Sequence, residues 1–182
     1  MSTQQAPGLQ VSVHGHPNAD TLLLWHPLVR TDPEAVAALA TRIAGRGGFR
    51  VVVPHWADGR DLLRSVRYAR TSTVHPPDAL SVVGYGEAGV AALSLALHQR
   101  RLGIGLARVT CVDAVPGTSD PISGQQLPEP PASPAESVAT AVDLIAGADE
   151  AAAEWARHTV DDWQAAGWAA TLVPADQFTW RL

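Results

Sequence analysis

The chain has 182 residues, of which 46% are hydrophobic, which is enough apolar material for one domain with a sizeable core. Its 13 basic residues against 18 acidic ones give a formal charge of −5 without any block of like charges, which disfavours nucleic-acid binding. A single cysteine, Cys111, excludes an intramolecular disulfide and a cysteine-only zinc site.

The beginning of the chain predicts a β-hairpin. Apolar runs at 9–13 and 21–25 are separated by residues 14–20, which include Gly, Pro, Asn and Asp. We therefore expect two antiparallel strands at the N-terminal edge of a sheet, with residues 1–8 as a flexible N-terminus.

Beyond this hairpin, patterns typical of helices alternate with short β-branched runs. Asp32 followed by Pro33 predicts a helix start, because Asp caps a first turn and Pro suits its first position. Further strands are expected at 49–53, 80–83, 108–112, 141–146 and 169–173, and further helices at 61–70, 90–97 and 150–165. This alternation predicts one α/β domain over residues 1–182, with a mostly parallel sheet of about seven strands and helices on both faces.

Functional side chains are expected at one edge of this sheet. In parallel α/β sheets, binding sites form at the carboxyl ends of the strands. The pocket candidates at these positions are Trp25, His26, His55, Trp56, Tyr85 and Glu87. Any chemistry that the chain performs should involve this edge.

One of the predicted strand-to-helix turns has a distinctive glycine pattern. Residues 84–89 are Gly-Tyr-Gly-Glu-Ala-Gly, which resembles the Gly-x-Ser-x-Gly nucleophile elbow of the α/β-hydrolases. Only with Gly86 at the nucleophile position are both flanking residues, Gly84 and Ala88, small enough for the tight turn. Glycine has no side chain with which to attack a carbonyl, so the resemblance implies an elbow without covalent catalysis.

Other motifs resemble those of the thioesterases that release chains from modular polyketide synthases. The turn at 54–59, Pro-His-Trp-Ala-Asp-Gly, is similar to their Pro-Gly-Phe-x-x-Gly, and the strand at 109–113 is similar to the one that presents their triad acid. Asp113 is then the equivalent of that acid. The segment at 173–179, Val-Pro-Ala-Asp-Gln-Phe-Thr, resembles their Val-Pro-Gly-Asp-His-Phe-Thr, which carries the catalytic base. Gln177 takes the place of that histidine, and an amide accepts no proton near neutral pH.

Two further features differ from the enzymes that the chain resembles. Residues 22–27 are similar to the oxyanion-hole strand and loop, but Pro27 has no backbone N–H, so Leu28 or Val29 would have to donate. The Pro/Gly/Ser-rich stretch at 115–134 predicts a loop in place of lid helices. The resemblance therefore does not extend to a covered acyl chamber.

Alternative roles of the site residues stay open. The N–H groups of the glycine-rich turn could bind phosphate, although Glu87 at the helix start would repel it. His26 and His55 end neighbouring strands, and together with Asp113 or Glu87 they could form an acid–base site. Asp113 could equally be a residue that only hydrogen-bonds its own loop.

Histidine, cysteine and tryptophan residues elsewhere have structural interpretations. His14 and His16 are expected to be solvated turn residues rather than a metal pair, because no third ligand accompanies them. Cys111 lies inside a strand pattern, as a buried small hydrophobic residue would. The tryptophans near the C-terminus should pack helices on the sheet, and any exposed ones would mark a partner surface: Trp155, Trp163, Trp168 and Trp180. We expect neither a metal nor a cofactor.

Two hypotheses of different classes follow. The leading one is a thioesterase-like pseudoenzyme that binds a polyketide-type ligand or a partner protein. The rival is a cyclase, lyase or isomerase that acts on a polyketide with strand-end His and Asp as acid and base.

No apolar run is long enough for a membrane span and no secretory leader is evident, so we expect a soluble, cytoplasmic protein without membrane contact, and homo-oligomerisation stays open. The basic residues are all arginine, which with the Ala, Gly and Pro content is typical of GC-rich bacterial genomes such as those of actinobacteria.

Overall fold

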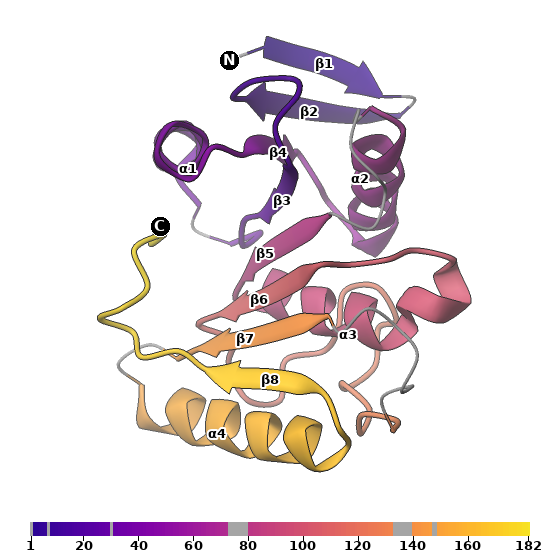
Figure 1. Cartoon of the computed structure of the whole chain (residues 1–182), viewed down its shortest axis with the longest axis vertical. Helices are drawn as coiled ribbons and strands as arrows, with labels where there is room; N and C mark the ends of the chain where they lie inside the picture. Colours follow the sequence, from indigo (N-terminus) through magenta and orange to yellow (C-terminus); the bar gives the residue numbers. More distant parts are fainter. Residues whose placement is uncertain (1, 7, 30, 73–79, 133–139, 147–148) are drawn as a thin grey trace.

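The computed structural model describes the whole chain except residues 1, 7, 30, 73–79, 133–139 and 147–148 (Figure 1). Its elements in chain order are β1 (Ser2–Ala6), β2 (Leu9–His14), β3 (Thr21–Trp25), α1 (Pro33–Gly47), β4 (Arg50–Pro54), α2 (Gly59–Thr71), β5 (Ser81–Tyr85), α3 (Glu87–Leu102), β6 (Arg108–Val112), β7 (Ala141–Ile145), α4 (Glu150–Ala165) and β8 (Ala169–Leu172). The predicted alternation of strands and helices after residue 31 is confirmed, with boundaries displaced by a few residues.

The strands form one eight-stranded sheet in the order β1-β2-β4-β3-β5-β6-β7-β8. All pairs from β4 to β8 are parallel, whereas β2 is antiparallel to both β1 and β4. The mostly parallel sheet with an antiparallel N-terminal edge is thus confirmed. It has one strand more than expected, because residues 2–6, within the segment expected to be a flexible N-terminus, pair with β2.

The predicted hairpin of residues 9–13 and 21–25 is wrong. These runs became β2 and β3, but β4 lies between them in the sheet. The hairpin that does form joins β1 to β2, with Ala6 opposite Leu9. The turn residues at 14–20 only reverse or redirect the chain, and they carry no information on whether the next strand lies beside the previous one or skips a place.

Helices α1, α2 and α4 each begin after an aspartate whose carboxylate accepts from N–H groups of the first turn, whereas α3 begins at Gly86 without a side-chain cap. The Asp32 carboxylate accepts from the Glu34 N–H at 3.0 Å, with Pro33 in the first turn, as predicted. Asp58 caps α2 by accepting from the N–H of Arg60 at 2.8 Å, so this helix starts two residues before the predicted position. Because each helix follows a strand and runs back along the sheet, all four helices begin at the carboxyl edge of the parallel strands (Figure 1).

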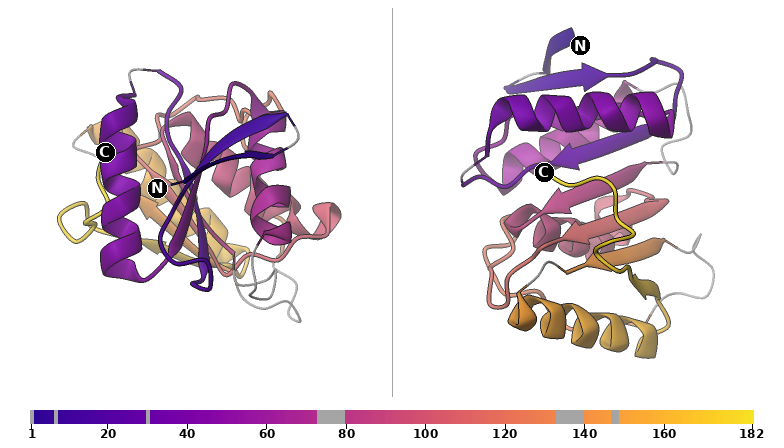
Figure 2. Two further views of the ribbon diagram at one scale, coloured as in Figure 1. Left: turned by 90° about the horizontal axis from the view of Figure 1, so that it is seen from above. Right: turned by 90° about the vertical axis from the view of Figure 1, so that its left-hand side faces the viewer.

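Two apolar clusters cover the two faces of the sheet. The larger packs α2, α3 and α4 on one face and includes the fully buried Trp25 and Trp163. The smaller packs α1 and residues 173–182, here called the C-terminal segment, on the other face. Figure 2 shows this segment crossing the sheet towards α1. Its half-buried Phe178 and Trp180 fill space beside α1 that the strands leave open.

Residues 115–132, the described part of the predicted loop at 115–134, contain turns and neither helix nor strand. Most of this loop is exposed, but it is fixed at one point, where the buried Asp120 carboxylate accepts from the N–H groups of Ile122 at 2.9 Å and Ser123 at 3.0 Å. A Cβ on Gly59 would lie 2.1 Å from the Pro121 carbonyl oxygen, so the loop lies directly against the start of α2. In the described part of the chain, no helix is long and apolar enough to cross a membrane.

Candidate functional site

The turn between β5 and α3 has the backbone of a nucleophile elbow. Gly86 stands between the strand and the helix with φ 59° and ψ −126°, a combination that side chains disfavour. Its N–H donates to the Val112 carbonyl on β6 at 2.8 Å. A Cβ at this position would meet only the Pro27 Cβ, at 3.8 Å, so the space that a nucleophilic side chain would occupy is open.

Gly84 and Gly89 lie where helix α3 approaches strands β5 and β6 too closely for a side chain. A Cβ on Gly84 would lie 2.2 Å from the Ala88 carbonyl oxygen, and a Cβ on Gly89 would lie 2.8 Å from the Cys111 sulfur. The contact at Gly84 explains why the residues that flank the nucleophile position must be small. The assignment of Gly86 to that position depends on this requirement. Both contacts also account for the glycine pattern without a bound phosphate.

The loop after β3 faces the elbow through Leu28. In hydrolases the oxyanion hole combines the N–H of the residue after the nucleophile with an N–H from this loop. Here the Leu28 N–H donates to the Glu87 carboxylate at 2.5 Å. The sequence indicates Glu87 and Leu28 separately as site residues, but it does not predict the hydrogen bond between them. No local sequence pattern predicts a contact between residues that are this far apart in the chain.

Asp113 lies beside the elbow at the end of β6. Among the described residues it is the only non-glycine with positive φ, at 52°, and its N–H donates to the Ile145 carbonyl at 2.9 Å. The side chain is exposed, yet partial desolvation raises the pKa of its carboxyl above the usual value, while the Arg181 guanidinium acts in the opposite direction. Asp113 therefore holds a proton more readily than an ordinary surface aspartate.

Gln177 lies exposed in the C-terminal segment, where its N–H donates to the Pro174 carbonyl at 3.0 Å. The described hydrogen bonds include none between Gln177 and Asp113. From this segment, the Arg181 guanidinium acts electrostatically on Asp113, and it also donates to the Ala175 carbonyl at 2.5 Å. Sequence reasoning did not single out Arg181, and no motif marks it.

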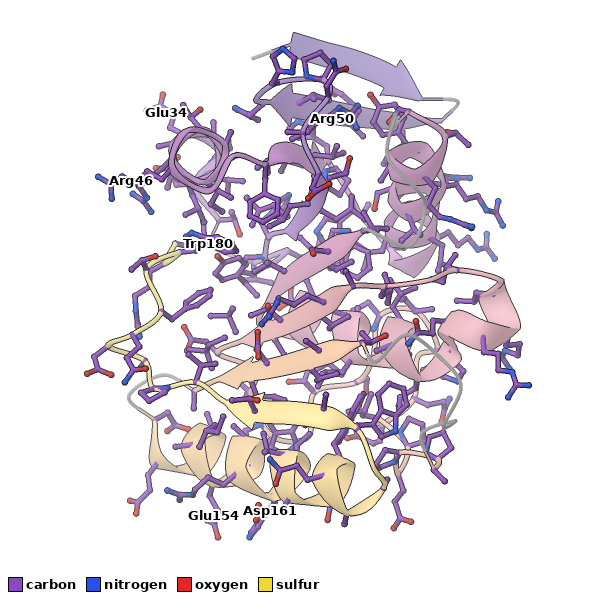
Figure 3. All side chains as sticks on the ribbon, viewed as in Figure 1. Glu34, Arg46, Arg50, Glu154, Asp161 and Trp180 are labelled. Atoms are coloured by element: carbon purple, nitrogen blue, oxygen red, sulfur yellow. The ribbon has the colours of Figure 1, made fainter. Side chains whose placement is uncertain are left out.

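Tyr85 belongs to the core rather than to a pocket. It is buried, and its hydroxyl donates to the Trp180 carbonyl at 2.5 Å, which fastens the C-terminal segment to the strand that leads into the elbow. Trp180 itself lies next to α1 (Figure 3) and meets the Phe49 ring edge-on at 6.0 Å. Burial raises the pKa of the Tyr85 phenol well above its usual range; the Arg42 guanidinium acts in the opposite direction, and the charge of Asp113 adds to the rise. The phenol therefore stays protonated near neutral pH.

The hydrogen bonds described for the two strand-end histidines go to partners other than Asp113. The His26 Nδ1–H donates to the Pro27 carbonyl at 2.8 Å, and its ring lies 6.3 Å from that of Trp56. His55 is exposed and its Nε2 lies 3.3 Å from the Ser12 hydroxyl on β2. The strands before His55 and Asp113 are three places apart in the sheet, or about 14 Å. A site that joins His55 to Asp113 is not formed.

Two of the pocket candidates, Trp25 and Trp56, are core residues. Trp25 is fully buried and its indole N–H donates to the Ser65 hydroxyl at 3.0 Å. Trp56 is buried as well, and its indole N–H donates to the His26 carbonyl at 2.9 Å, which positions the loop after β3. Of the six candidates, His26, His55 and Glu87 keep accessible side chains.

The two histidines near the N-terminus lie in different environments. His14 is buried with its Nδ1 3.0 Å from the Thr41 hydroxyl, so its expected solvation is wrong, and burial lowers the pKa of its imidazole. His16 is exposed and its Nδ1 accepts from the Asn18 N–H at 3.2 Å. In the ranges that the structure describes, no group of three or more His, Cys, Asp or Glu side chains could hold a metal ion.

Cys111 and the C-terminal tryptophans have the packing roles expected of them. Cys111 is buried behind the elbow, and burial raises the pKa of its thiol well above its usual range. Trp163 is buried against Trp168, with ring centroids 4.8 Å apart. Trp155, Trp168 and Trp180 are half-buried against the two apolar clusters. They do not gather into an exposed patch.

The sheet order, the helix placement and the elbow define the α/β-hydrolase fold, and solved structures agree. The chain is similar to EstE7, a hormone-sensitive-lipase homologue from a metagenome library, with a TM-score of 0.75 and 12% identity over 96% of this chain and 75% of that one. An esterase of the bacterial hormone-sensitive lipase family gives a TM-score of 0.67 with 17% identity, over 95% of this chain and 73% of that one. An α/β-hydrolase from Vibrio vulnificus gives a TM-score of 0.66 with 13% identity, over 94% of this chain and 71% of that one. No protein-family model matches the chain, and no curated protein is similar to it in sequence. At these identities the likeness shows the fold alone.

Proposed function

We propose that this chain is an α/β-hydrolase-fold pseudoenzyme, which binds a polyketide-type ligand or a partner protein at the elbow without hydrolysing it. The elbow backbone is built as in a hydrolase, but position 86 has no side chain and position 177 has no basic nitrogen. A fold that keeps its elbow and loses the reacting groups fits a binding role.

The bond between Glu87 and Leu28 carries this proposal. A hydrolase uses such a donor to stabilise the negative oxygen of a tetrahedral intermediate, and one donor contributes about 2.7–4 kcal/mol to the transition state. In this protein a carboxylate already accepts from the Leu28 N–H at 2.5 Å. An approaching oxyanion would lose that donor and meet a second negative charge. The arrangement therefore disfavours acyl transfer even if another residue supplied a nucleophile.

The polyketide part of the proposal is supported by sequence resemblance. The motifs at 54–59, 109–113 and 173–179 resemble those of chain-releasing thioesterases. Their order along the chain follows the strands β4, β6 and β8, as the resemblance requires. A related acyl group is therefore the ligand class to examine first.

The test is a panel of N-acetylcysteamine thioesters and p-nitrophenyl esters of increasing acyl length. We expect no turnover above buffer at any chain length. Hydrolysis by the wild-type protein that disappears in Glu87→Gln or Asp113→Asn would refute the proposal, because the elbow would then be catalytic. Asp161→Asn, at an exposed position of α4, is the matched control.

One observation favours a second candidate, an acid–base enzyme without a covalent step. Asp113 combines strained backbone with a raised carboxyl pKa immediately beside the elbow, and such residues gather at catalytic sites. Its test is proton exchange at the α-carbon of β-keto thioesters in heavy water, followed by NMR. Exchange that is lost in Asp113→Asn and kept in Asp161→Asn, an exposed position of α4, would support this candidate, and equal exchange in both variants would exclude it.

A further inference from the structure

A positively charged side chain is buried at the amino edge of the parallel strands, at the opposite end from the elbow. Arg50 begins β4 and is 4% exposed, and Thr21 begins the neighbouring strand β3 and is 3% exposed. The two residues stand opposite each other in the register of β3 and β4, so their side chains lie on the same face of the sheet. The end of α2 covers this face and brings Tyr68 and Ser72 against Arg50.

The Arg50 guanidinium has fewer partners than its burial requires. Its Nη2 donates to the Ser72 hydroxyl at 3.1 Å, and its central carbon lies 5.9 Å from the centre of the Tyr68 ring. The other terminal nitrogen, Nη1, is shielded from solvent and has no hydrogen-bond partner in the described part of the chain. The hydroxyl of Thr21 is buried without a partner there as well. Two polar groups that begin neighbouring strands are therefore both unsatisfied.

The positive charge of Arg50 also lacks a counter-ion. Among the described residues, no carboxylate forms an ion pair with this guanidinium. Buried charges in proteins are normally paired, because a charge removed from water is strongly destabilising when nothing opposes it. The C-terminal end of α2 offsets part of the charge, since a helix end carries about half an elementary negative charge. A buried water would satisfy the hydrogen bonds but not the remaining charge, so the missing partner is an anion.

We propose that Arg50 and Thr21 bind a small inorganic anion, chloride or phosphate, between the amino ends of β3 and β4 and the end of α2. The Arg50 Nη1 supplies charge-assisted hydrogen bonds and the Thr21 hydroxyl supplies another. Both groups are shielded from solvent, which excludes a phosphate or carboxylate that belongs to a nucleic acid, a membrane or a partner protein. The anion joins three elements and stabilises the folded protein. This site is separate from the elbow and does not depend on the binding role proposed above.

The test is thermal unfolding of the full-length protein while chloride or phosphate replaces gluconate, a larger anion, at constant pH and ionic strength. An anion that binds the folded state raises the melting temperature with its concentration relative to Kd. We expect the gain to develop over the concentration range of a specific site with chloride, with phosphate, or with both. The salt that gives the gain identifies the ion as a halide or an oxyanion. General salt effects are instead the same in every variant.

Three variants assign the gain to this site. Arg50→Gln removes the charge and should weaken anion binding by about tenfold or more, whereas Thr21→Val removes one hydroxyl with little change of shape and should weaken binding by about fivefold. The Thr21 variant keeps the test decisive if Arg50→Gln does not fold. Arg46→Gln is the matched control, because Arg46 is exposed in the last turn of α1 and points away from the fold (Figure 3). It should keep the wild-type response to anions.

Two results would overturn the inference. If neither salt raises the melting temperature above that in gluconate, the groups are satisfied by water alone. If the gain is the same in wild type, Arg50→Gln and Thr21→Val, the anion binds elsewhere. Neither result bears on ester hydrolysis, and turnover of the thioester panel by the wild-type protein would leave the anion site unaffected.

Discussion

A side chain added at the two glycines of the elbow should destabilise the protein to different degrees. At Gly86 the added Cβ has room, with 3.8 Å to the Pro27 Cβ, but the positive φ strains any side chain, so Gly86→Ala should cost about 1–3 kcal/mol. At Gly84 the added Cβ would lie 2.2 Å from the Ala88 carbonyl oxygen, where real Cβ contacts essentially never fall below 3.0 Å. Backbone atoms must move to relieve it, so Gly84→Ala should cost about 3 kcal/mol or more.

The measurement is the free energy of unfolding in urea, with Gly45→Ala as the control. Gly45 lies in α1 with nothing near its added Cβ, so alanine should stabilise the protein there by about 0.5–1 kcal/mol. If Gly84→Ala is as stable as wild type, strand β5 and helix α3 are not as close as described. If Gly86→Ala loses no stability, the turn lacks the positive φ of a nucleophile elbow.

Three further predictions concern the reacting groups, the C-terminal segment and pH. In the folded double variant Gly86→Ser/Gln177→His, a fluorophosphonate probe should label the serine at position 86 slowly. Adding Glu87→Gln should accelerate the labelling, because the Leu28 N–H is then free to bind the oxyanion. If neither variant is labelled, the side chains at positions 86 and 177 do not meet. Tyr85→Phe should lower the free energy of unfolding by about 0.5–1.5 kcal/mol in urea titrations, since the Trp180 carbonyl loses its donor; an unchanged value would contradict that bond. Burial lowers the pKa of His14 in the folded protein below the usual 6.5, so the unfolded chain binds the proton more readily. The free energy of unfolding should therefore be highest above pH 6.5 and decrease as the pH falls below it. His14→Gln should flatten this dependence in thermal melts across pH 5–8.

Local signals in the sequence predicted the elements well. The helix at Asp32 and Pro33 starts as expected because a cap is a property of adjacent residues. The hairpin of residues 9–13 and 21–25 failed because sheet order depends on contacts between distant strands. Both runs are strands, but only the whole sheet decides that β4 is inserted between them.

The sequence by itself determined what the elbow lacks. Gly86 has no nucleophile and Gln177 has no proton-accepting nitrogen wherever they lie, since these are properties of the residue types. Only the tertiary structure decided that the Glu87 carboxylate accepts from the Leu28 N–H and that His55 is remote from Asp113. It also decided that Arg181, and not a histidine, acts on the Asp113 carboxyl. Such contacts join residues far apart in the chain, and the sheet order that brings them together or separates them is set by burial of the whole core.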